Sequence, residues 1–220
     1  MSSSSTPFAR LSFTWVPRWL VVVLVLGVVA IVSFVALDRW FPEAVRPVVE
    51  AARDVYAEKK ALVHKDAILH ASAESGVDPY LLAGLMISES SGNIGAVSHK
   101  GALGLFQLMP ETARWRAEKL GIPAPTRDEL LTDAFLNARL GADNLAWLLG
   151  RYDGNPERAL VAYNAGPGRL ARFEREAGGW EAWSKERRSS GNSEIFRYVD
   201  RVLAYAESFE SARIFEADGM

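Results

Sequence analysis

A glutamate at the end of an apolar segment is the group in this sequence best placed for acid–base chemistry. Glu89 follows the run LLAGLMIS and directly precedes Ser90-Ser91-Gly92. A carboxyl group held against apolar walls loses hydration, which disfavours its charged form and raises its pKa. A carboxylic acid that stays protonated near neutral pH can donate a proton to a leaving glycosidic oxygen. The position alone favours a solvated glutamate at a helix end, so the surrounding residues must decide.

The residues after Glu89 suit the binding of a polar ligand. Gly92–Gly104 contains four glycines and few helix formers, which predicts a loop. Gly101 and Gly104 indicate a turn with positive φ or a close approach of the chain to a sugar. The amide of Gln107 can donate and accept hydrogen bonds, either with hydroxyl and acetamido groups or between the loop and a helix. Met109 is interpreted as an apolar wall for a sugar face or as a core residue.

Two later segments carry further candidates. In A-Y-N-A-G, the phenol of Tyr163 is expected to hydrogen-bond to Glu89 or to a reacting sugar, and Asn164 to fix the turn that follows. The last segment, E-I-F-R-Y-V, begins at Glu194 and contains Tyr198, which is interpreted as a core residue.

In order and spacing, these motifs resemble the soluble-lytic-transglycosylase (SLT) domain family of the lysozyme-like superfamily. The stretch ISESSGNIGAVSHKGALGLFQLMPETA resembles its first motifs, AYNAGPGRL a later one, and E-x-x-x-Y-V the closing one. The similarity covers about residues 62–210. It implies an all-α, lysozyme-like helical domain whose substrate is the glycan strand of peptidoglycan.

The resemblance also implies a reaction. Glu89 would protonate the β-1,4 bond between N-acetylmuramic acid and N-acetylglucosamine, then take the proton from the muramic acid O6, leaving 1,6-anhydro ends. Glu194 and Ser98 resemble substrate contacts of the family, although Ser98 also fits a plain turn serine. With Gln107, Met109 and Tyr163 these form the predicted substrate-binding set, supported by Ser90 and Asn164.

The departures from the family pattern concern two motifs. Phe106 stands where the family often has Met, which predicts a reshaped subsite. The closing motif lacks the usual E-T-R start, which weakens the role of Glu194.

Ordinary glycosidases need two carboxylates, yet no other acid falls in a motif of catalytic type. A hydrolytic muramidase on the same fold and a weakly catalytic wall-binding component of a secretion or conjugation apparatus remain as alternatives.

Composition argues against several other classes of protein. The formal net charge of the 220 residues is −2, with no basic excess of the kind that nucleic-acid binding requires. The chain has no cysteine, and His64, His70 and His99 do not form an H-E-x-x-H spacing. We therefore expect no metal, no cofactor and no nucleic-acid partner.

The run of 19 uncharged residues at 19–37 predicts a transmembrane helix that contacts membrane lipid. Such a helix rises about 28 Å, close to the thickness of the hydrocarbon core. Arg10 and Arg18 precede it without acids, so residues 1–18 are expected to form a cytoplasmic stub. The protein would then be a single-pass protein of the bacterial inner membrane whose domain faces the periplasm or cell wall. A cleaved signal peptide is the alternative, although no A-x-A-like cleavage site follows the run.

The rest of the chain reads as helices that position the motifs. Residues 38–60 predict a helical connector, which Pro42 and Pro47 interrupt early, 61–212 the catalytic domain, and 213–220 a tail. Caps and apolar periodicity predict these helices within the domain: Ala61–Ser75, one opened by Asp78-Pro79, Pro110–Leu120, Thr132–Gly150, one from Asn155-Pro156 to Gly166, Pro167–Ala177 and Ser193–Phe209. Residues 178–192 match no motif. Trp180 and Trp183 could stack on sugars or pack in the core, and packing in the core is favoured.

Overall fold

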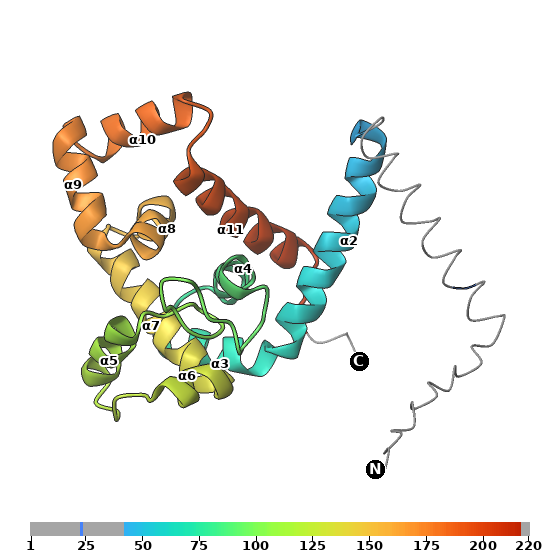
Figure 1. Ribbon diagram of the computed structural model, residues 1–220, viewed down its shortest axis with the longest axis vertical. Coiled ribbons are helices and arrows are strands. Elements are labelled where there is room, and N and C mark those ends of the chain that lie inside the picture. Colours follow the sequence, from blue (N-terminus) through green and yellow to red (C-terminus); the bar gives the residue numbers. More distant parts are fainter. Residues whose placement is uncertain (1–22, 24–41, 217–220) are drawn as a thin grey trace, which may run out of the picture. The chain divides into compact units, whose positions relative to one another are not determined.

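The computed structural model describes residue 23 and residues 42–216 (Figure 1). The described part is helical, and its extended pairing is limited to isolated bridges from Leu103 to Val97 and to Leu108. The all-α prediction is therefore confirmed for these residues. The helices are α2 (Pro42–Val63), α3 (Lys65–Ser75), α4 (Pro79–Ser90), α5 (Pro110–Lys119), α6 (Arg127–Thr132), α7 (Ala134–Arg151), α8 (Pro156–Ala165), α9 (Pro167–Ala177), α10 (Trp180–Ser189) and α11 (Glu194–Ser211).

The chain divides into two compact units, residues 1–52 and residues 53–220, and every candidate site residue lies in the second. The hydrophobic core of this unit is built around α4, which Figure 1 shows nearly end-on beside α11. Residues 82–87 of α4 are all buried. The helix packs most extensively against α11 and also contacts α3. A helix that is apolar on all sides has to be enclosed in this way, as its sequence predicts.

Gly84 allows α4 and α11 to approach closely. A Cβ atom at Gly84 would lie 2.5 Å from the carbonyl oxygen of Val202 and 2.9 Å from the amide nitrogen of Ala206. These are backbone atoms of α11, which cannot move aside as a flexible side chain would. The absence of a side chain at Gly84 therefore fixes the separation of the two helices that carry the acid and its partner.

Local capping chemistry explains the helix ends that the sequence predicts. Asp78 accepts a hydrogen bond from the amide of Leu81 at 2.8 Å, and Pro79 begins α4. Asn155 caps α8 in the same way. Gly76 ends α3 with φ of +72°, a left-handed conformation that glycine adopts without strain.

Two expectations about helices are wrong. The helix predicted from Ala61 to Ser75 is broken at His64, whose Nε2 lies 2.9 Å from the carbonyl oxygen of Gly92. Pro47 lies inside α2, because the loss of one backbone hydrogen bond does not end a helix continued by good helix formers. In α7, Phe135 is 50% exposed and packs edge-on against His70. The segment 178–192, for which no element was predicted, contains α10.

The predicted transmembrane segment, residues 19–37, lies outside the described residues except for Val23. No helix found within the described ranges has the length and apolar character needed to cross a membrane.

Candidate active site

The carboxyl group of Glu89 meets a phenol from the far end of the chain. Glu89 is in the last turn of α4, and its Oε1 accepts a hydrogen bond of 2.5 Å from the hydroxyl of Tyr198 on α11. Tyr198 is 6% exposed, so the expected packing in the core is confirmed, but its hydroxyl also orients the candidate acid. The two residues are 109 positions apart, and the close packing of α4 on α11 brings them together.

The surroundings of Glu89 raise the pKa of its carboxyl group to about 7. Burial is the largest cause, because the charged form loses hydration there. The hydrogen bond from Tyr198 and the positive charge of Arg201 act in the opposite direction. No second carboxylate is among the groups that shift this pKa in the described structure. Glu89 is therefore about half protonated at neutral pH and has one oxygen, Oε2, left for a ligand.

The loop between α4 and α5 forms a second wall, and Asn137 of α7 holds it in place. The fully buried Asn137 side chain accepts from the amide of Phe106 at 2.9 Å and donates to the carbonyl oxygens of Leu103 at 3.2 Å and Leu130 at 3.0 Å. A Cβ atom at Gly104 would overlap the Asn137 amide. Gly104, with φ of +77°, therefore allows the predicted close approach, but the groups that approach it are the side chain of Asn137 and the carbonyl oxygen of Leu130.

Phe106 and Tyr163 connect this loop to the helices behind it. Phe106 is fully buried, and its ring fills the space that a side chain at Gly141 of α7 would need. The predicted reshaping of a sugar subsite by Phe106 is therefore wrong, because the ring points into the core. The hydroxyl of Tyr163 on α8 donates to the carbonyl oxygen of Phe106 at 2.8 Å, in place of the predicted bond to Glu89. The charge of Glu89 nevertheless helps to raise the pKa of Tyr163, after the larger effect of burial.

Three of the predicted substrate-binding residues lie in or directly after the loop. The side-chain amide of Gln107 donates to the carbonyl oxygens of Ala96 at 3.2 Å and Gly104 at 2.9 Å, both within the loop, which leaves its own oxygen as an acceptor. The hydroxyl oxygen of Ser98 accepts from the amide of Ala102 at 2.9 Å and so stabilises a turn. Met109 is 43% exposed, which rules out the alternative of a core methionine.

The remaining predicted residues are more peripheral. The hydroxyl of Ser90 donates to the carbonyl oxygen of Met86 in its own helix at 3.2 Å. Asn164 is exposed near the end of α8, and the turn after it is closed by the backbone bond from Gly166 to Ala162 at 2.8 Å. Glu194 begins α11 with a side chain that is 91% exposed and lies 3.7 Å from Arg197.

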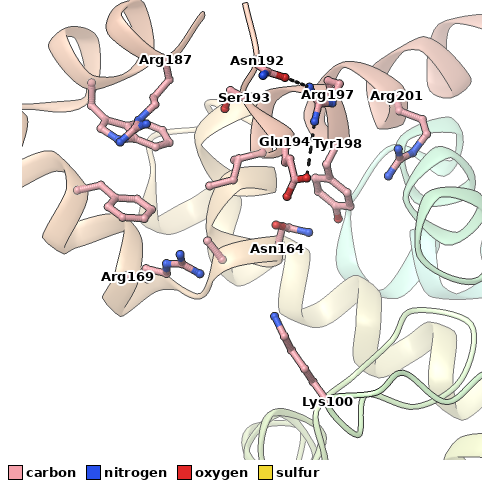
Figure 2. A pocket seen from close by; sticks show the side chains of 14 residues that line it. Lys100, Asn164, Arg169, Arg187, Asn192, Ser193, Glu194, Arg197, Tyr198 and Arg201 are labelled. Atoms are coloured by element: carbon pink, nitrogen blue, oxygen red, sulfur yellow. Dashed lines mark hydrogen bonds and ion pairs between the residues drawn. The ribbon is translucent and has the colours of Figure 1, made fainter. Parts of the chain in front are cut away.

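A pocket of about 740 Å³ opens beside this arrangement, and Figure 2 shows side chains that line it. Asn164, Glu194 and Tyr198 are among the lining residues, so the pocket begins at the residue that hydrogen-bonds to Glu89. Tyr198 is the functional candidate that the sequence reasoning missed. Its signal was present, because it lies four residues after Glu194 in the closing motif and therefore on the same helix face.

Within the described residues, no group of three or more His, Asp or Glu side chains could hold a metal ion. The arrangement is therefore built from one titratable carboxyl group, a phenol that orients it, a loop rich in polar backbone groups, and an adjoining pocket.

A known family of proteins matches more than half of this chain. The family model described as the transglycosylase SLT domain matches residues 66–185. The chain is 41% identical over 106 residues to the transglycosylase of Enterobacteria phage PRD1, covering 48% of this chain and 36% of the phage protein. It is 34% identical over 129 residues to the membrane-bound lytic murein transglycosylase C of Edwardsiella ictaluri, covering 54% and 35% of the two chains.

The fold is also similar to a solved structure, that of the lytic transglycosylase Slt from Pseudomonas aeruginosa. The TM-score is 0.59 at 29% sequence identity, and the match covers 70% of this chain and 25% of the Slt chain. That structure is of an inactive variant in which a glutamate is replaced by glutamine. The matched region thus spans only about a quarter to a third of the length of these proteins.

Proposed function

The chain belongs to the transglycosylase SLT domain family, and from this premise we propose that it is a lytic transglycosylase of peptidoglycan. In this proposal the enzyme cleaves the β-1,4 bond between N-acetylmuramic acid and N-acetylglucosamine and leaves 1,6-anhydro-N-acetylmuramic acid ends. The observation that carries the proposal is the carboxyl group of Glu89, partly buried, hydrogen-bonded to Tyr198 and with its pKa raised to about 7.

Glu89 would act first as an acid and then as a base. Its protonated carboxyl group donates a proton to the glycosidic oxygen as the bond to the anomeric carbon of muramic acid breaks. The resulting carboxylate then removes the proton from the O6 hydroxyl of the same sugar, whose oxygen bonds to the anomeric carbon. A group serves both steps well when its pKa is near the ambient pH, and a pKa of about 7 meets this condition.

Tyr198 would position the acid and moderate its pKa. Its hydroxyl donates to Oε1, so the carboxyl group is held by one oxygen while Oε2 is left for the substrate. The hydrogen bond stabilises the carboxylate form and, together with the charge of Arg201, opposes the effect of burial on the pKa. Burial alone would keep the group protonated to higher pH and make it a weaker base in the second step.

The lack of a second carboxylate near Glu89 supports intramolecular transfer over hydrolysis. Retaining and inverting glycosidases use two carboxyl groups on either side of the sugar. In the described structure the electrostatic influences on Glu89 come from Tyr198 and Arg201 and from no other acid. When the O6 hydroxyl of the same sugar attacks the anomeric carbon, no carboxylate of the enzyme has to bind covalently to the sugar.

Five residues are proposed to bind the glycan. The side-chain oxygen of Gln107 and the hydroxyl of Ser98 supply polar contacts from the loop, and the exposed Met109 supplies an apolar one. Tyr163 supports the loop through Phe106, and Glu194 contributes from the pocket wall. Ser90 and Asn164 are proposed in supporting roles at the ends of α4 and α8.

Product analysis tests the reaction. Purified peptidoglycan is digested with the protein, and the soluble fragments are weighed by mass spectrometry. We expect anhydro ends, which are one water lighter than reducing ends. A product set dominated by reducing ends would show a hydrolytic muramidase and overturn the proposed reaction.

We further propose that residues 19–37 anchor the domain to the inner membrane with the domain on the outer side. Support comes from the uncharged run itself and from the unopposed Arg10 and Arg18 before it. A relative with 34% identity is named as membrane-bound. The test compares the parent with a Val25→Arg/Val29→Arg variant, since each arginine at the centre of a spanning helix costs about 3 kcal/mol. The parent should stay in the membrane after alkaline extraction, and the variant should be released from it.

The same experiment distinguishes an anchor from a signal peptide. The intact mass of the membrane-associated protein should include residues 1–37. A mature protein that begins after residue 37 would mean that the segment is cleaved and does not anchor the domain.

A further inference from the structure

Basic side chains gather around the pocket beside Glu89. Five cations line it, against one carboxylate, that of Glu194. They come from four separate segments, as Figure 2 shows: Lys100 from the loop, Arg169 from α9, Arg187 from α10, and Arg197 and Arg201 from α11. In the same view Arg169 and Arg187 lie on one side of the pocket and Arg201 on the other. This concentration stands out in a chain whose formal net charge is −2.

Four of these five cations form no ion pair within the described structure. Arg197 has Glu194 at 3.7 Å and the side-chain oxygen of Asn192 at 2.9 Å. No ion pair involves any of the other four in the described ranges. Arg188 shows the contrast, because it lies next to Arg187 and bridges Glu157 at 2.8 Å and Asp200 at 3.0 Å. Acids are thus available nearby, yet they neutralise the neighbour and leave the pocket positive.

An aromatic cluster holds the helices that present Arg169 and Arg187. Trp183 of α10 is 3% exposed, and its ring stacks on Phe173 of α9 with centroids 5.3 Å apart. Arg187 follows Trp183 by four residues, and Arg169 precedes Phe173 by four, so each cation lies one turn from the stack. The guanidinium of Arg169 also lies 5.3 Å from the centroid of Phe173. The stacked rings therefore hold α9 and α10 together, and these two helices carry both cations.

The same wall contains an unsatisfied donor. The indole N–H of Trp183 is buried and has no acceptor among the described residues. A buried donor without a partner is unfavourable, and Trp183 is one of the residues that line the pocket. Because this nitrogen is covered by the protein, a ligand in the pocket cannot reach it, and the case for a ligand depends on the cations.

The position of the pocket restricts which anions can reach it. Tyr198 both lines the pocket and hydrogen-bonds to Glu89, so a ligand in the pocket adjoins the reacting bond. The sugar rings of a peptidoglycan strand carry hydroxyl and acetamido groups and no charge. The charged group of the strand is the substituent on the lactyl ether of muramic acid, as a free carboxylate or as a peptide with several. The volume of about 740 Å³ lies in the range of small-ligand sites.

We propose that this basic pocket binds the carboxylates carried by the lactyl substituent of muramic acid. The proposal rests on the proposed function, because it assumes that a muramic acid residue lies at Glu89. The arginines then act in substrate selection: they favour strands whose substituents are charged over strands whose substituents are neutral. Their planar guanidinium groups suit carboxylates, which they bind through two parallel hydrogen bonds.

Binding measurements with a matched pair of double variants test this. The test variant is Arg169→Gln/Arg187→Gln. The control is Arg175→Gln/Lys185→Gln, which removes two exposed cations from the same two helices outside the pocket. Both are made in a Glu89→Gln background so that ligands stay intact. Titration calorimetry uses three N-acetylglucosaminyl-N-acetylmuramic acid disaccharides: one with a free-carboxylate peptide, one with the same peptide fully amidated, and one with the bare lactyl carboxylate.

We expect the test variant to bind at least one carboxylate ligand about threefold to tenfold more weakly and the amidated ligand within twofold of the background. The loss should shrink at high salt, and Arg169→Lys/Arg187→Lys should recover part of it. A loss confined to the peptide ligand identifies the peptide carboxylates, and one also seen with the bare disaccharide identifies the lactyl carboxylate. Equal losses for the charged and amidated ligands, or no loss for either carboxylate ligand, would overturn the proposal.

The result of this binding test can be distinguished from the result of the product analysis that tests the proposed reaction. Binding is measured without turnover, whereas the reaction is judged from the ends that the parent protein produces. Reducing ends together with a carboxylate-specific loss would refute the transglycosylase reaction and keep the pocket. Anhydro ends together with an equal loss of affinity for the charged and amidated ligands would support the transglycosylase reaction and refute the proposed role of the pocket.

Discussion

The two walls of the site are held by different forces. The α4–α11 pair, which carries Glu89 and Tyr198, is held by apolar packing and by the close approach at Gly84. The loop at 91–109 is held mainly by hydrogen bonds to its backbone, among them those of Asn137. Packing sets distances between whole helices, whereas individual polar contacts set the path of an irregular segment.

Because the two walls are held differently, we expect them to have different functions. The helix pair buries the carboxyl group and supplies the hydrogen bond that tunes its pKa, so it should control the proton transfers. The loop places Gln107 and Met109 beside it, so it should control how the glycan is held. Changes in the first wall should therefore appear in kcat and its pH dependence, and changes in the second wall in KM and stability.

The strongest test removes the acid from the helix pair. Glu89→Gln should reduce turnover by about 10³-fold or more, because one group serves both proton transfers. Binding of the glycan should be retained, since the amide keeps the size of the side chain and can still accept from Tyr198. Turnover is measured by release of soluble fragments from labelled peptidoglycan.

The same variant should also be more stable at alkaline pH. The folded-state pKa of Glu89 is about 7 against an ordinary value of 4.5. The unfolded chain therefore releases this proton first, and the parent loses stability as pH rises between these values. Glu89→Gln should avoid a loss of roughly 3 kcal/mol at pH 8 and differ little at pH 4. Denaturant melts at both pH values measure this, with the exposed Glu207→Gln as control. A variant that clears peptidoglycan as fast as the parent would mean that Glu89 is not the acid.

The next largest effect is expected in the loop. Asn137→Ala leaves the buried amide of Phe106 without its acceptor and removes one donor each from the buried carbonyl oxygens of Leu103 and Leu130. The carbonyl of Leu103 keeps the amide of Leu108 at 3.0 Å. The free energy of unfolding should fall by about 3–4 kcal/mol, and KM should rise. Asn144→Ala is the matched control, because Asn144 is a buried asparagine of the same helix without a hydrogen bond to the loop. Equal destabilisation by the two changes would show that Asn137 acts through packing alone.

Widening the helix pair should have a smaller and different effect. In Gly84→Ala the added methyl group meets the backbone of α11, which must shift at a cost of about 1–3 kcal/mol. The shift lengthens the bond between Glu89 and Tyr198, so kcat should fall while KM changes little. Gly150→Ala in α7, where no atom lies within 4 Å of the new Cβ, should be neutral or stabilising by up to about 1 kcal/mol. Thermal melts and steady-state rates on both variants measure the contrast.

The sequence allows helices to be predicted where residues within one turn determine their ends. Asp78-Pro79 and Gly76 bound their helices as predicted, because caps act within one turn. The short helix α6 was missed although Thr126 and Glu129 form its capping box. The break at His64 has no such local signal, since its ring is held by Gly92, which is 28 residues away.

The site could be predicted only in part, because some of its contacts join residues far apart in the sequence. Glu89 could be proposed from its apolar helix and its motif, and its raised pKa agrees with the desolvation argument. The partner of its carboxyl group depends on the register between α4 and α11, which no pattern within either helix reveals. Asn137 likewise appears in the sequence as one polar residue in an amphipathic helix, and its role depends on three backbone groups in other segments. Tyr163 was assigned the hydrogen bond that Tyr198 makes.

The pair of tyrosines allows the finest test of the division between the walls. Tyr198→Phe and Tyr163→Phe each remove one hydroxyl group, but the first loses the bond to Glu89 and the second the bond to the carbonyl of Phe106. The bond from Tyr198 lowers the pKa of Glu89, so its loss should raise that pKa. Because the first step needs the protonated acid, the alkaline limb of the kcat profile should move to higher pH in Tyr198→Phe, by up to about one unit.

Tyr163→Phe should instead leave the alkaline limb in place and raise KM, because Tyr163 supports the loop and makes no hydrogen bond to the acid. Tyr205→Phe on α11, a ring that stacks on Phe209, controls for the loss of a hydroxyl group from that helix. Rates between pH 5 and pH 9 are sufficient to separate the three variants. If both active-site tyrosines moved the limb equally, the loop would also be setting the proton affinity of Glu89, and the two walls would have to be treated as one electrostatic unit.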